Sequence, residues 1–404
     1  MIKKKNIFFL VITVLTVFEY AFSCTGFYIA KEDKIFACNN EDNPYPLTKM
    51  WTIPRSDHLY GRIYFGYDNF SPQGGINEKG LFFDAFASDK LPINVYDEKP
   101  KYDKFFDDIR NEIMATCSNV HDVIKFINNY NLSSNNLFEN AMFLFGDAEG
   151  NSIIIDGSNI FTKSGDFQVV TNFHVSQNEE ITCKRYLTAT RMLKDLDMPS
   201  VFKCRDVLDS VHASDTIYSQ VYDLKNLKIY IYNFHNFNDC YEVNLKDEFK
   251  KGLTCYDLPS LFKYSEPYEE FKKQNWDKYS KVFNDLFNKN IGNQISNNYL
   301  GDYFHLTFQG PDLNVINLSD SLHTVSIKQV EAGICLRENF GCYGEFKLYP
   351  ISDNKYFYLT RFYWAEIIFE PNNGFRLIAQ LYDKSVKKWI TRFKKGHNNG
   401  IKSD

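Results

Sequence analysis

The feature that most constrains this chain is its beginning, where an export-type segment ends directly at a cysteine. Three lysines at 3–5 give a positive start, and a mostly apolar run over 6–18 follows, too short to span a bilayer comfortably. Ala21-Phe22-Ser23 then places small residues at positions −3 and −1 of a cleavage site. The pattern predicts a secretory signal peptide over 1–23 whose removal exports a protein that begins at Cys24. An uncleaved N-terminal anchor is the alternative.

An N-terminal cysteine carries a nucleophile and a base on one residue. The reference pKa of an α-amine is about 7.7–8.0 and that of a thiol about 8.5. The amine of Cys24 can therefore take the thiol proton near neutral pH, and no histidine is required. Such a residue still needs a partner for its amine and donors for the oxyanion that develops. Because this residue begins the first strand, we expect that strand to lie inside a sheet.

Four further segments carry residue types that such chemistry uses. They follow Cys24-Thr25-Gly26 in the order Asn39-Asn40-Glu41-Asp42, Gly75-Ile76-Asn77-Glu78-Lys79-Gly80-Leu81, Val170-Thr171-Asn172 and Arg185-Tyr186. Taken singly, each has an ordinary explanation: Asp42 can cap a turn, Asn172 can end a strand, and Arg185 can be an exposed helix residue. Their combination and order favour a functional interpretation.

In this order the segments resemble the choloylglycine hydrolase family. These are N-terminal-nucleophile linear amide C–N hydrolases, and they include bile salt hydrolases, penicillin V acylases and acid ceramidase-like enzymes. The resemblance implies that Cys24 is the nucleophile and that Asp42 holds its α-amine. It implies that the side chain of Asn172 completes the oxyanion hole, to which the backbone N–H of Ala87 also donates. Arg185 is implied to lie beside the nucleophile.

The sequence departs from the family pattern at two positions. The family has an arginine three residues before its aspartate, whereas this chain has Asn39. Ala87 stands where bile salt hydrolases have asparagine and penicillin acylases have tyrosine, so it offers a backbone group but no polar side chain. Asn39, Asn40 and His174 are predicted as possible substrate-pocket residues.

The predicted function is therefore an exported cysteine hydrolase that cleaves a linear, non-peptide N-acyl amide of a small molecule through a thioester on Cys24. One alternative is a secreted dipeptidase of the related cysteine branch, which also begins Cys-Thr and carries an Asn-[DE]-Asp segment such as Asn40-Glu41-Asp42. The other alternative is a non-catalytic surface binding protein that is lipidated at Cys24.

The chain is predicted to be α+β. Strand-like and helix-like segments alternate over 24–265, and the resemblance implies a four-layer αββα core there. The elements expected in this part include strands over 25–30 and 216–222, helices over 103–115 and 183–195, a further helix with Ser118 as its N-cap, a turn over 147–151 and a mixed connector over 239–265. Closer to the C-terminus, a single strand is expected over 356–369. An amphipathic linker helix is expected over 266–290, and a small all-β domain of unknown role, a barrel or a sandwich, over 291–394. Residues 395–404 are expected to be a disordered tail. Aromatic residues, at 17%, suit such a strand-rich chain.

Composition narrows the possible partners. The net charge of −5 gives no basic field for nucleic acid, and no segment beyond the leader contains about 18 apolar residues, so no membrane span is expected after cleavage. The sequence has no His-x-x-x-His or Cys-x-x-Cys spacing, so neither a metal site nor a cofactor is predicted. Oligomeric state stays open.

The nine cysteines are an odd number. Cys24 is expected to stay free as the catalyst, and the remaining eight could form disulfides in an exported protein. Cys183 could pair with Cys204 between neighbouring helices, and Cys335 with Cys342 across a hairpin.

Overall fold

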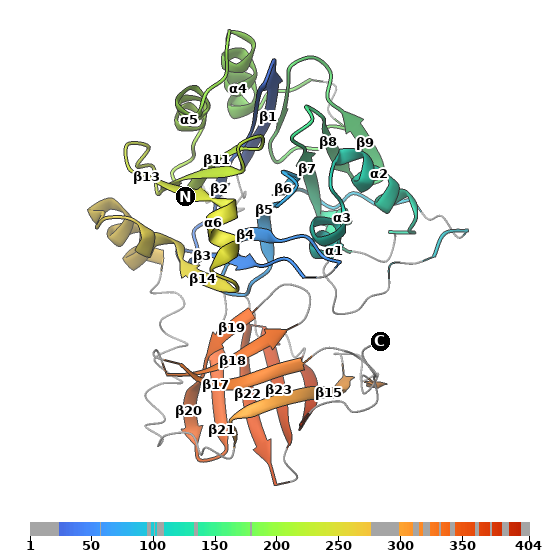
Figure 1. The fold of residues 1–404 in the computed structure, drawn as a ribbon, viewed down its shortest axis with the longest axis vertical. Coiled ribbons are helices and arrows are strands. Elements are labelled where there is room, and N and C mark those ends of the chain that lie inside the picture. The colour runs from blue at the N-terminus through green and yellow to red at the C-terminus, as the bar shows by residue number, and fades with distance from the viewer. Residues whose placement is uncertain are drawn as a thin grey trace, which may run out of the picture.

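The chain folds into three antiparallel sheets with helices packed on two of them (Figure 1). The computed structural model describes residues 24–275 and 299–396, except for short stretches at 57, 95–97, 101, 103–108, 133–135, 178–179, 310–314, 318–323, 331–332, 340–343, 360–362, 372–373 and 382–387. The predicted signal peptide, most of the linker helix and most of the tail therefore lie outside the described residues. The fold is mixed α/β and consists mostly of sheet.

The first sheet has six strands, and Cys24 directly precedes one of its interior strands, β1. Its order is β10 (Phe167–Val170), β1 (Thr25–Lys31), β2 (Lys34–Asp42), β11 (Thr216–Asp223), β12 (Lys228–Asn233) and β13 (Cys240–Asn244). As predicted, β1 lies inside the sheet, between β10 and β2. Because the backbone of β1 is hydrogen-bonded to a strand on each side, Cys24, which directly precedes β1, is held in a fixed position.

The second sheet has eight strands. Its order is β14 (Thr254–Asp257), β3 (Thr48–Ile53), β4 (Arg62–Tyr67), β5 (Pro72–Asn77), β6 (Phe82–Ala87), β7 (Ala141–Gly146), β8 (Ser152–Asp156) and β9 (Asn159–Thr162). Residues 239–265, which the sequence pattern gave only as a connector, supply β13 and β14 at the edges of the two sheets. Both strands are short and mostly half-exposed, so they lack a clear apolar alternation.

Large aromatic side chains fill the space between these two sheets. Tyr222 of β11 meets Phe82 of β6 at a ring-centroid distance of 4.8 Å and Phe65 of β4 at 6.1 Å. All three are fully buried in one apolar cluster that also contains Cys24. The site therefore lies at an end of this shared core.

Helices cover the outer faces of both sheets. The first sheet packs on α4 (Lys184–Lys194) and α5 (Val201–Ser210) through an apolar cluster that includes Phe27 and Leu208. The second packs on α1 (Ile109–Thr116) and α2 (Val120–Asn128) through Phe83, Ile113 and others. Two short helices, α3 (Asn136–Asn140) and α6 (Leu245–Lys250), and the 3₁₀ helix η1 (Leu258–Leu261) complete this part.

One helix start differs from the sequence prediction. Ser118 was expected as the N-cap of the second helix, but Asn119 holds that position, and its side chain accepts the Asp122 N–H at 3.0 Å. Ser118 instead donates its hydroxyl to the Asp122 carboxylate at 2.6 Å. Serine and asparagine are both common N-cap residues. Here the Asp122 carboxylate engages the Ser118 hydroxyl, and Asn119 is the N-cap. The first helix was expected over 103–115, of which the structure describes residues from Ile109 onward.

The third sheet lies near the C-terminus and has ten strands. Nine follow the order β19 (Gly344–Lys347), β18 (Gly333–Asn339), β17 (Thr324–Val330), β15 (Gly301–Gln309), β24 (Lys388–Lys395), β23 (Gly374–Leu381), β22 (Tyr363–Glu370), β21 (Lys355–Leu359) and β20 (Tyr349–Ser352), and β16 (Val315–Asn317) pairs with β15. Because β19 also contacts β21, the sheet is nearly closed. The strand predicted over 356–369 is two strands, β21 and β22, paired with each other.

This sheet packs against the second sheet. The ring of Phe70, which lies between β4 and β5, meets that of Phe346 on β19 edge to face at 5.4 Å, and side chains from both sheets belong to one apolar cluster. The predicted linker helix is helical over 266–275, and 276–290 lies outside the described residues. Lys395, placed in the predicted tail, ends β24. The predicted domain boundaries stay predictions.

The cysteines do not form the disulfide that was expected between two helices. Cys183 and Cys204 are both free, as are the other six cysteines in the described part of the chain. Cys204 instead contacts Cys38 of β2 from α5. Cys335 is free, and its proposed partner Cys342 lies outside the described residues. Within the described ranges, no helix is both long and apolar enough to cross a membrane.

Candidate active site

Cys24 stands where β1 begins and points into the core between the first two sheets. Its side chain is 5% exposed, and its thiol lies 3.8 Å from Oε2 of Glu41 and 4.0 Å from the carbonyl oxygen of Asp42. Burial raises the pKa of the Cys24 thiol, and the negative charges of Glu41 and Asp42 raise it further. In the uncleaved chain the nitrogen of Cys24 belongs to a peptide bond, so its thiol has no amine beside it to act as a base.

Asp42 ends β2 next to Cys24 and is fully buried. The Thr216 hydroxyl donates a short hydrogen bond to Oδ1 of Asp42, and Oδ2 lies 3.9 Å from the Arg185 guanidinium. Burial raises the pKa of the Asp42 carboxyl, while the Thr216 hydrogen bond and the Arg185 charge lower it. A carboxylate in this position is suited to orient a cation such as an N-terminal ammonium.

Arg185 reaches the same place from the start of α4. Its Nη1 donates to the carbonyl oxygen of Cys24 at 2.7 Å and to Oγ1 of Thr25 at 2.6 Å. The structure thus brings together three of the four residues predicted as catalytic: Cys24, Asp42 and Arg185. Cys24 and Asp42 come from the start of β1 and the end of the next strand, β2, whereas Arg185 comes from the start of α4, 161 positions after Cys24.

Asn172 follows β10, the strand that pairs with β1 on the other side. Gly26 is opposite Val170, so the antiparallel register, continued by two residues, places Asn172 opposite Cys24. The Asn172 side chain donates one N–H to the carbonyl oxygen of Ala87 at 2.8 Å. An asparagine amide has two N–H donors, so the second remains for an oxyanion. The group of Ala87 that contacts Asn172 is its carbonyl, whereas the resemblance implied a role for its N–H.

The three predicted pocket residues have different surroundings. Both ring nitrogens of buried His174 are engaged, Nδ1 with the Asp156 carboxylate at 2.6 Å and Nε2 with the carbonyl oxygen of Asp89 at 2.7 Å. His174 therefore ties neighbouring loops together. Asn40 faces α5 and donates to the carbonyl oxygen of Leu208 at 2.9 Å.

Asn39 points the other way, into the core between the first two sheets. It is 1% exposed and its amide bonds the carboxyl group of Asp84 on β6. Glu41, two residues along the same strand, shares this face, because side chains alternate along a strand. Glu41 accepts a 2.5 Å hydrogen bond from the Tyr67 hydroxyl with Oε1 and faces the Cys24 thiol with Oε2.

Sequence reasoning missed Glu41, Asp84 and Thr216 as members of this site. Glu41 could have been found, because strand alternation places it on the same face as Asn39. Asp84 and Thr216 arrive from other strands, and no local pattern marks them.

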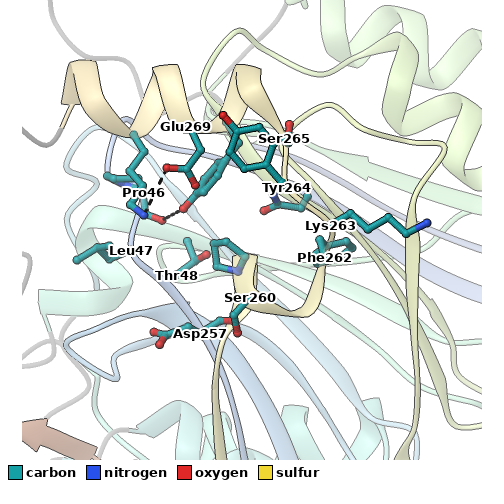
Figure 2. A pocket seen from close by; sticks show the side chains of 14 residues that line it. Pro46, Leu47, Thr48, Asp257, Ser260, Phe262, Lys263, Tyr264, Ser265 and Glu269 are labelled. Carbon is teal, nitrogen blue, oxygen red and sulfur yellow. Dashed lines mark hydrogen bonds and ion pairs between the residues drawn. The ribbon is translucent and has the colours of Figure 1, made fainter. Parts of the chain in front are cut away.

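One cavity of the described structure is separate from the thiol. It has a volume of about 420 Å³ and lies where β3 begins and β12 ends, under the helix over 266–275. Figure 2 shows Pro46, Leu47 and Thr48 on one side of it and Glu269 on the helix above. Cys24 is not among the residues that line it. Within the described ranges, no group of three His, Cys, Asp or Glu side chains is arranged to hold a metal ion.

Comparison with known proteins identifies similar solved structures but no sequence relatives. No protein-family model and no curated protein matches the chain. Two structures of conjugated bile acid hydrolase variants from Clostridium perfringens are similar to 60% of this chain, at 17% and 15% identity, with TM-scores of 0.43 and 0.45, and cover 97% and 99% of those chains. Penicillin V acylase from Agrobacterium tumefaciens is similar to 60% of this chain and 98% of its own, at 15% identity and a TM-score of 0.44.

These solved structures belong to the choloylglycine hydrolase family, the family that the sequence motifs resemble. At such low identities and TM-scores, the chemistry of the site rests on this chain's own residues.

Proposed function

We propose that this protein is an exported N-terminal-nucleophile hydrolase that cleaves linear amide C–N bonds through a thioester on Cys24. The observation that carries the proposal is the assembly of Cys24, Asp42 and Arg185 at the start of an interior strand. A thiol, a buried carboxylate and a guanidinium within one small volume are the groups that an N-terminal cysteine needs for activation. We further propose that the two inner sheets and their outer helices form the four-layer αββα architecture of such enzymes.

Activation requires cleavage between Ser23 and Cys24. Hydrolysis of that peptide bond gives Cys24 a free α-amine, which is the only base that the mechanism needs. In the uncleaved chain the Cys24 nitrogen is still part of a peptide bond, so the thiol, which is 5% exposed, lacks this base. Export thus becomes the event that starts the activity.

The reaction begins when the Cys24 thiol gives its proton to its own α-amine and its sulfur bonds to the acyl carbon. Asp42 holds the resulting ammonium, and the second N–H of Asn172, with a backbone N–H near Ala87, stabilises the oxyanion. The ammonium then protonates the leaving nitrogen as the C–N bond breaks, which releases the amine and leaves a thioester. The same amine then takes a proton from water, whose oxygen bonds to the acyl carbon of the thioester. The C–S bond breaks, the acyl group leaves as a carboxylic acid, and the ammonium returns its proton to sulfur.

The test is amide hydrolysis by protein whose N-terminus at residue 24 has been verified by mass. Cys24→Ala and Cys24→Ser are expected to lower kcat/KM by at least about 10³-fold, as loss of a nucleophile does elsewhere. Cys240→Ser is the matched control, because Cys240 is an exposed free thiol on β13. Activity that survives in both Cys24 variants would refute the mechanism.

The alternative of a dipeptidase is favoured by one observation, the contact of Glu41 with the Cys24 thiol. A carboxylate beside the nucleophile suits a substrate that carries a positive charge near its scissile bond.

A further inference from the structure

Three buried polar side chains line the floor of the site behind Cys24. Asn39 and Glu41 come from β2 and Asp84 comes from the facing strand β6, and they are 1%, 3% and 1% exposed. Asn39 bonds Asp84, and the charges of Glu41 and Asp84 both act on the Cys24 thiol. The three therefore form one group, defined here as the acidic floor.

The acidic floor has acceptors without donors. Oδ1 of Asn39 and Oδ2 of Asp84 are buried and accept no hydrogen bond from the described part of the chain. Buried polar atoms nearly always have partners, and an unsatisfied one costs about 1–3 kcal/mol. A ligand that supplies N–H donors at this place would remove that cost.

Negative charge beside Cys24 opposes the proposed chemistry, because it disfavours formation of a thiolate. Burial raises the pKa of the Cys24 thiol, and Glu41, Asp42 and Asp84 each raise it further, which disfavours the thiolate nucleophile. Asp42 has Arg185 beside it, 3.9 Å away. A positive charge bound beside Oε2 of Glu41, 3.8 Å from the sulfur, would lower the pKa of the Cys24 thiol and favour the thiolate.

We propose that the acidic floor binds the ammonium group of the substrate, and that the enzyme cleaves amides of acyl groups bearing a free α-amine, including dipeptides. An ammonium has three donors and no acceptor, so it can donate to Oε2 of Glu41 and to the acceptors without partners, Oδ1 of Asn39 and Oδ2 of Asp84. The inference deepens the proposed function and rests on it for the position of the scissile bond.

The distances agree with this assignment. In an aminoacyl amide the ammonium nitrogen is two bonds, or about 2.5 Å, from the scissile carbon. The attacking sulfur lies about 3–3.5 Å from that carbon, and a charged N–H···O bond is about 2.7–2.9 Å long. Oε2 of Glu41 lies 3.8 Å from the sulfur. One substrate can therefore place its scissile carbon against the sulfur and its ammonium against Oε2 at the same time.

The test separates recognition from catalysis by using the inactive Cys24→Ala protein that begins at residue 24. Its affinity is measured by calorimetry for alanine 4-nitroanilide and for the lactoyl analogue, which replaces the ammonium by a hydroxyl of similar size. The expected dissociation constant is about 10- to 100-fold lower for the alanyl compound, the range for a charged hydrogen bond. Adding Glu41→Gln is expected to reduce this ratio to near one without weakening lactoyl binding.

One control variant and one further test variant accompany Glu41→Gln. Glu242→Gln removes a half-exposed carboxylate on β13, and the alanyl preference should persist in it. Asp84→Asn should reduce the preference and provides a second variant if Glu41→Gln does not fold. Equal binding of the two compounds by Cys24→Ala, or an equal loss of both in Glu41→Gln, would overturn the inference.

Failure of the proposed function gives a different result. In that case protein with intact Cys24 hydrolyses neither compound in a thiol-dependent manner, whatever the two affinities are.

Discussion

Replacing Asn77 by alanine tests the structural role of the Gly75–Leu81 segment. Asn77 ends β5, is fully buried, and makes four side-chain hydrogen bonds. Its Nδ2 donates to the carbonyl oxygens of Met114 and Cys117 at 2.9 Å each, at the end of α1. Its Oδ1 accepts the backbone N–H of Lys79 at 3.0 Å and of Leu81 at 3.1 Å. One side chain therefore closes the turn into β6 and satisfies the last carbonyls of a helix.

The magnitude follows from these four bonds. Each is worth about 1 kcal/mol net, so Asn77→Ala should lower the free energy of unfolding by about 4 kcal/mol. The assay is urea unfolding of protein that begins at residue 24, read at the transition in which the β5–β6 region unfolds, with the slope unchanged. Asn244→Ala is the matched control: Asn244 accepts only from the N–H groups of Lys246 and Asp247 at the start of α6. Loss of such an exposed cap should cost about 1 kcal/mol.

A destabilisation by Asn77→Ala no larger than that of Asn244→Ala would contradict this account. It would mean that water replaces the four bonds at no cost, which a fully buried side chain should not allow.

Further predictions concern pKa values and packing. Thr216→Val removes the hydroxyl that lowers the pKa of Asp42, so the acid limb of kcat/KM should move to higher pH; an unmoved limb would exclude Asp42 from the mechanism. Burial raises the pKa of Asp84, so folding favours its protonated carboxyl group. The contribution of Asp84 to the free energy of unfolding is fully present below the unfolded pKa of about 3.9 and is lost as the pH rises through the folded pKa. Urea midpoints measured from pH 4 upward should therefore fall relative to those of Asp84→Asn, and a constant difference would contradict this. Gly146→Ala places a Cβ against the ring of Tyr28, closer than van der Waals contact allows, and should lower the free energy of unfolding by about 1–3 kcal/mol, which thermal unfolding measures.

Local patterns in the sequence predicted much of the fold. Thr25–Lys31 and Thr216–Asp223 were expected as strands with small differences at their ends, and α4 was expected over nearly its observed range. Each of these elements has a clear apolar pattern or a turn signal at its ends. The turn over 147–151 was also expected, and the Asp147 side chain closes it by accepting the N–H groups of Glu149 and Asn151.

The candidate site was predictable only where one short motif carried the information. Cys24, Asp42 and Arg185 each lie in a recognisable segment. Thr216 reaches Asp42 across 174 positions of sequence, where a register shift on β11 interrupts the pairing with β2. The register shift does not follow from local propensity, because it depends on how two distant strands pair. The contact of Asp84 with Asn39 does not follow either, because it depends on how the two sheets pack.

The free cysteines illustrate the same limit. Cys183 and Cys204 lie on neighbouring helices, yet Cys183 accepts from the Thr171 hydroxyl at 3.6 Å while Cys204 faces Cys38. A disulfide needs particular directions of the Cβ vectors, which sequence spacing does not determine.

The central claim is that Cys24 becomes the N-terminal nucleophile, and one measurement tests it most directly. Protein purified from cells that express the full sequence is quenched in acid while it turns over the best substrate from a panel of aminoacyl and N-acyl amides. Its N-terminal peptide is then analysed by mass spectrometry. We expect a peptide that begins at Cys24 with a free α-amine and carries the acyl mass on sulfur as a hydroxylamine-sensitive thioester. A peptide that begins elsewhere, a lipid on Cys24, or no acyl mass during ongoing hydrolysis would contradict the claim.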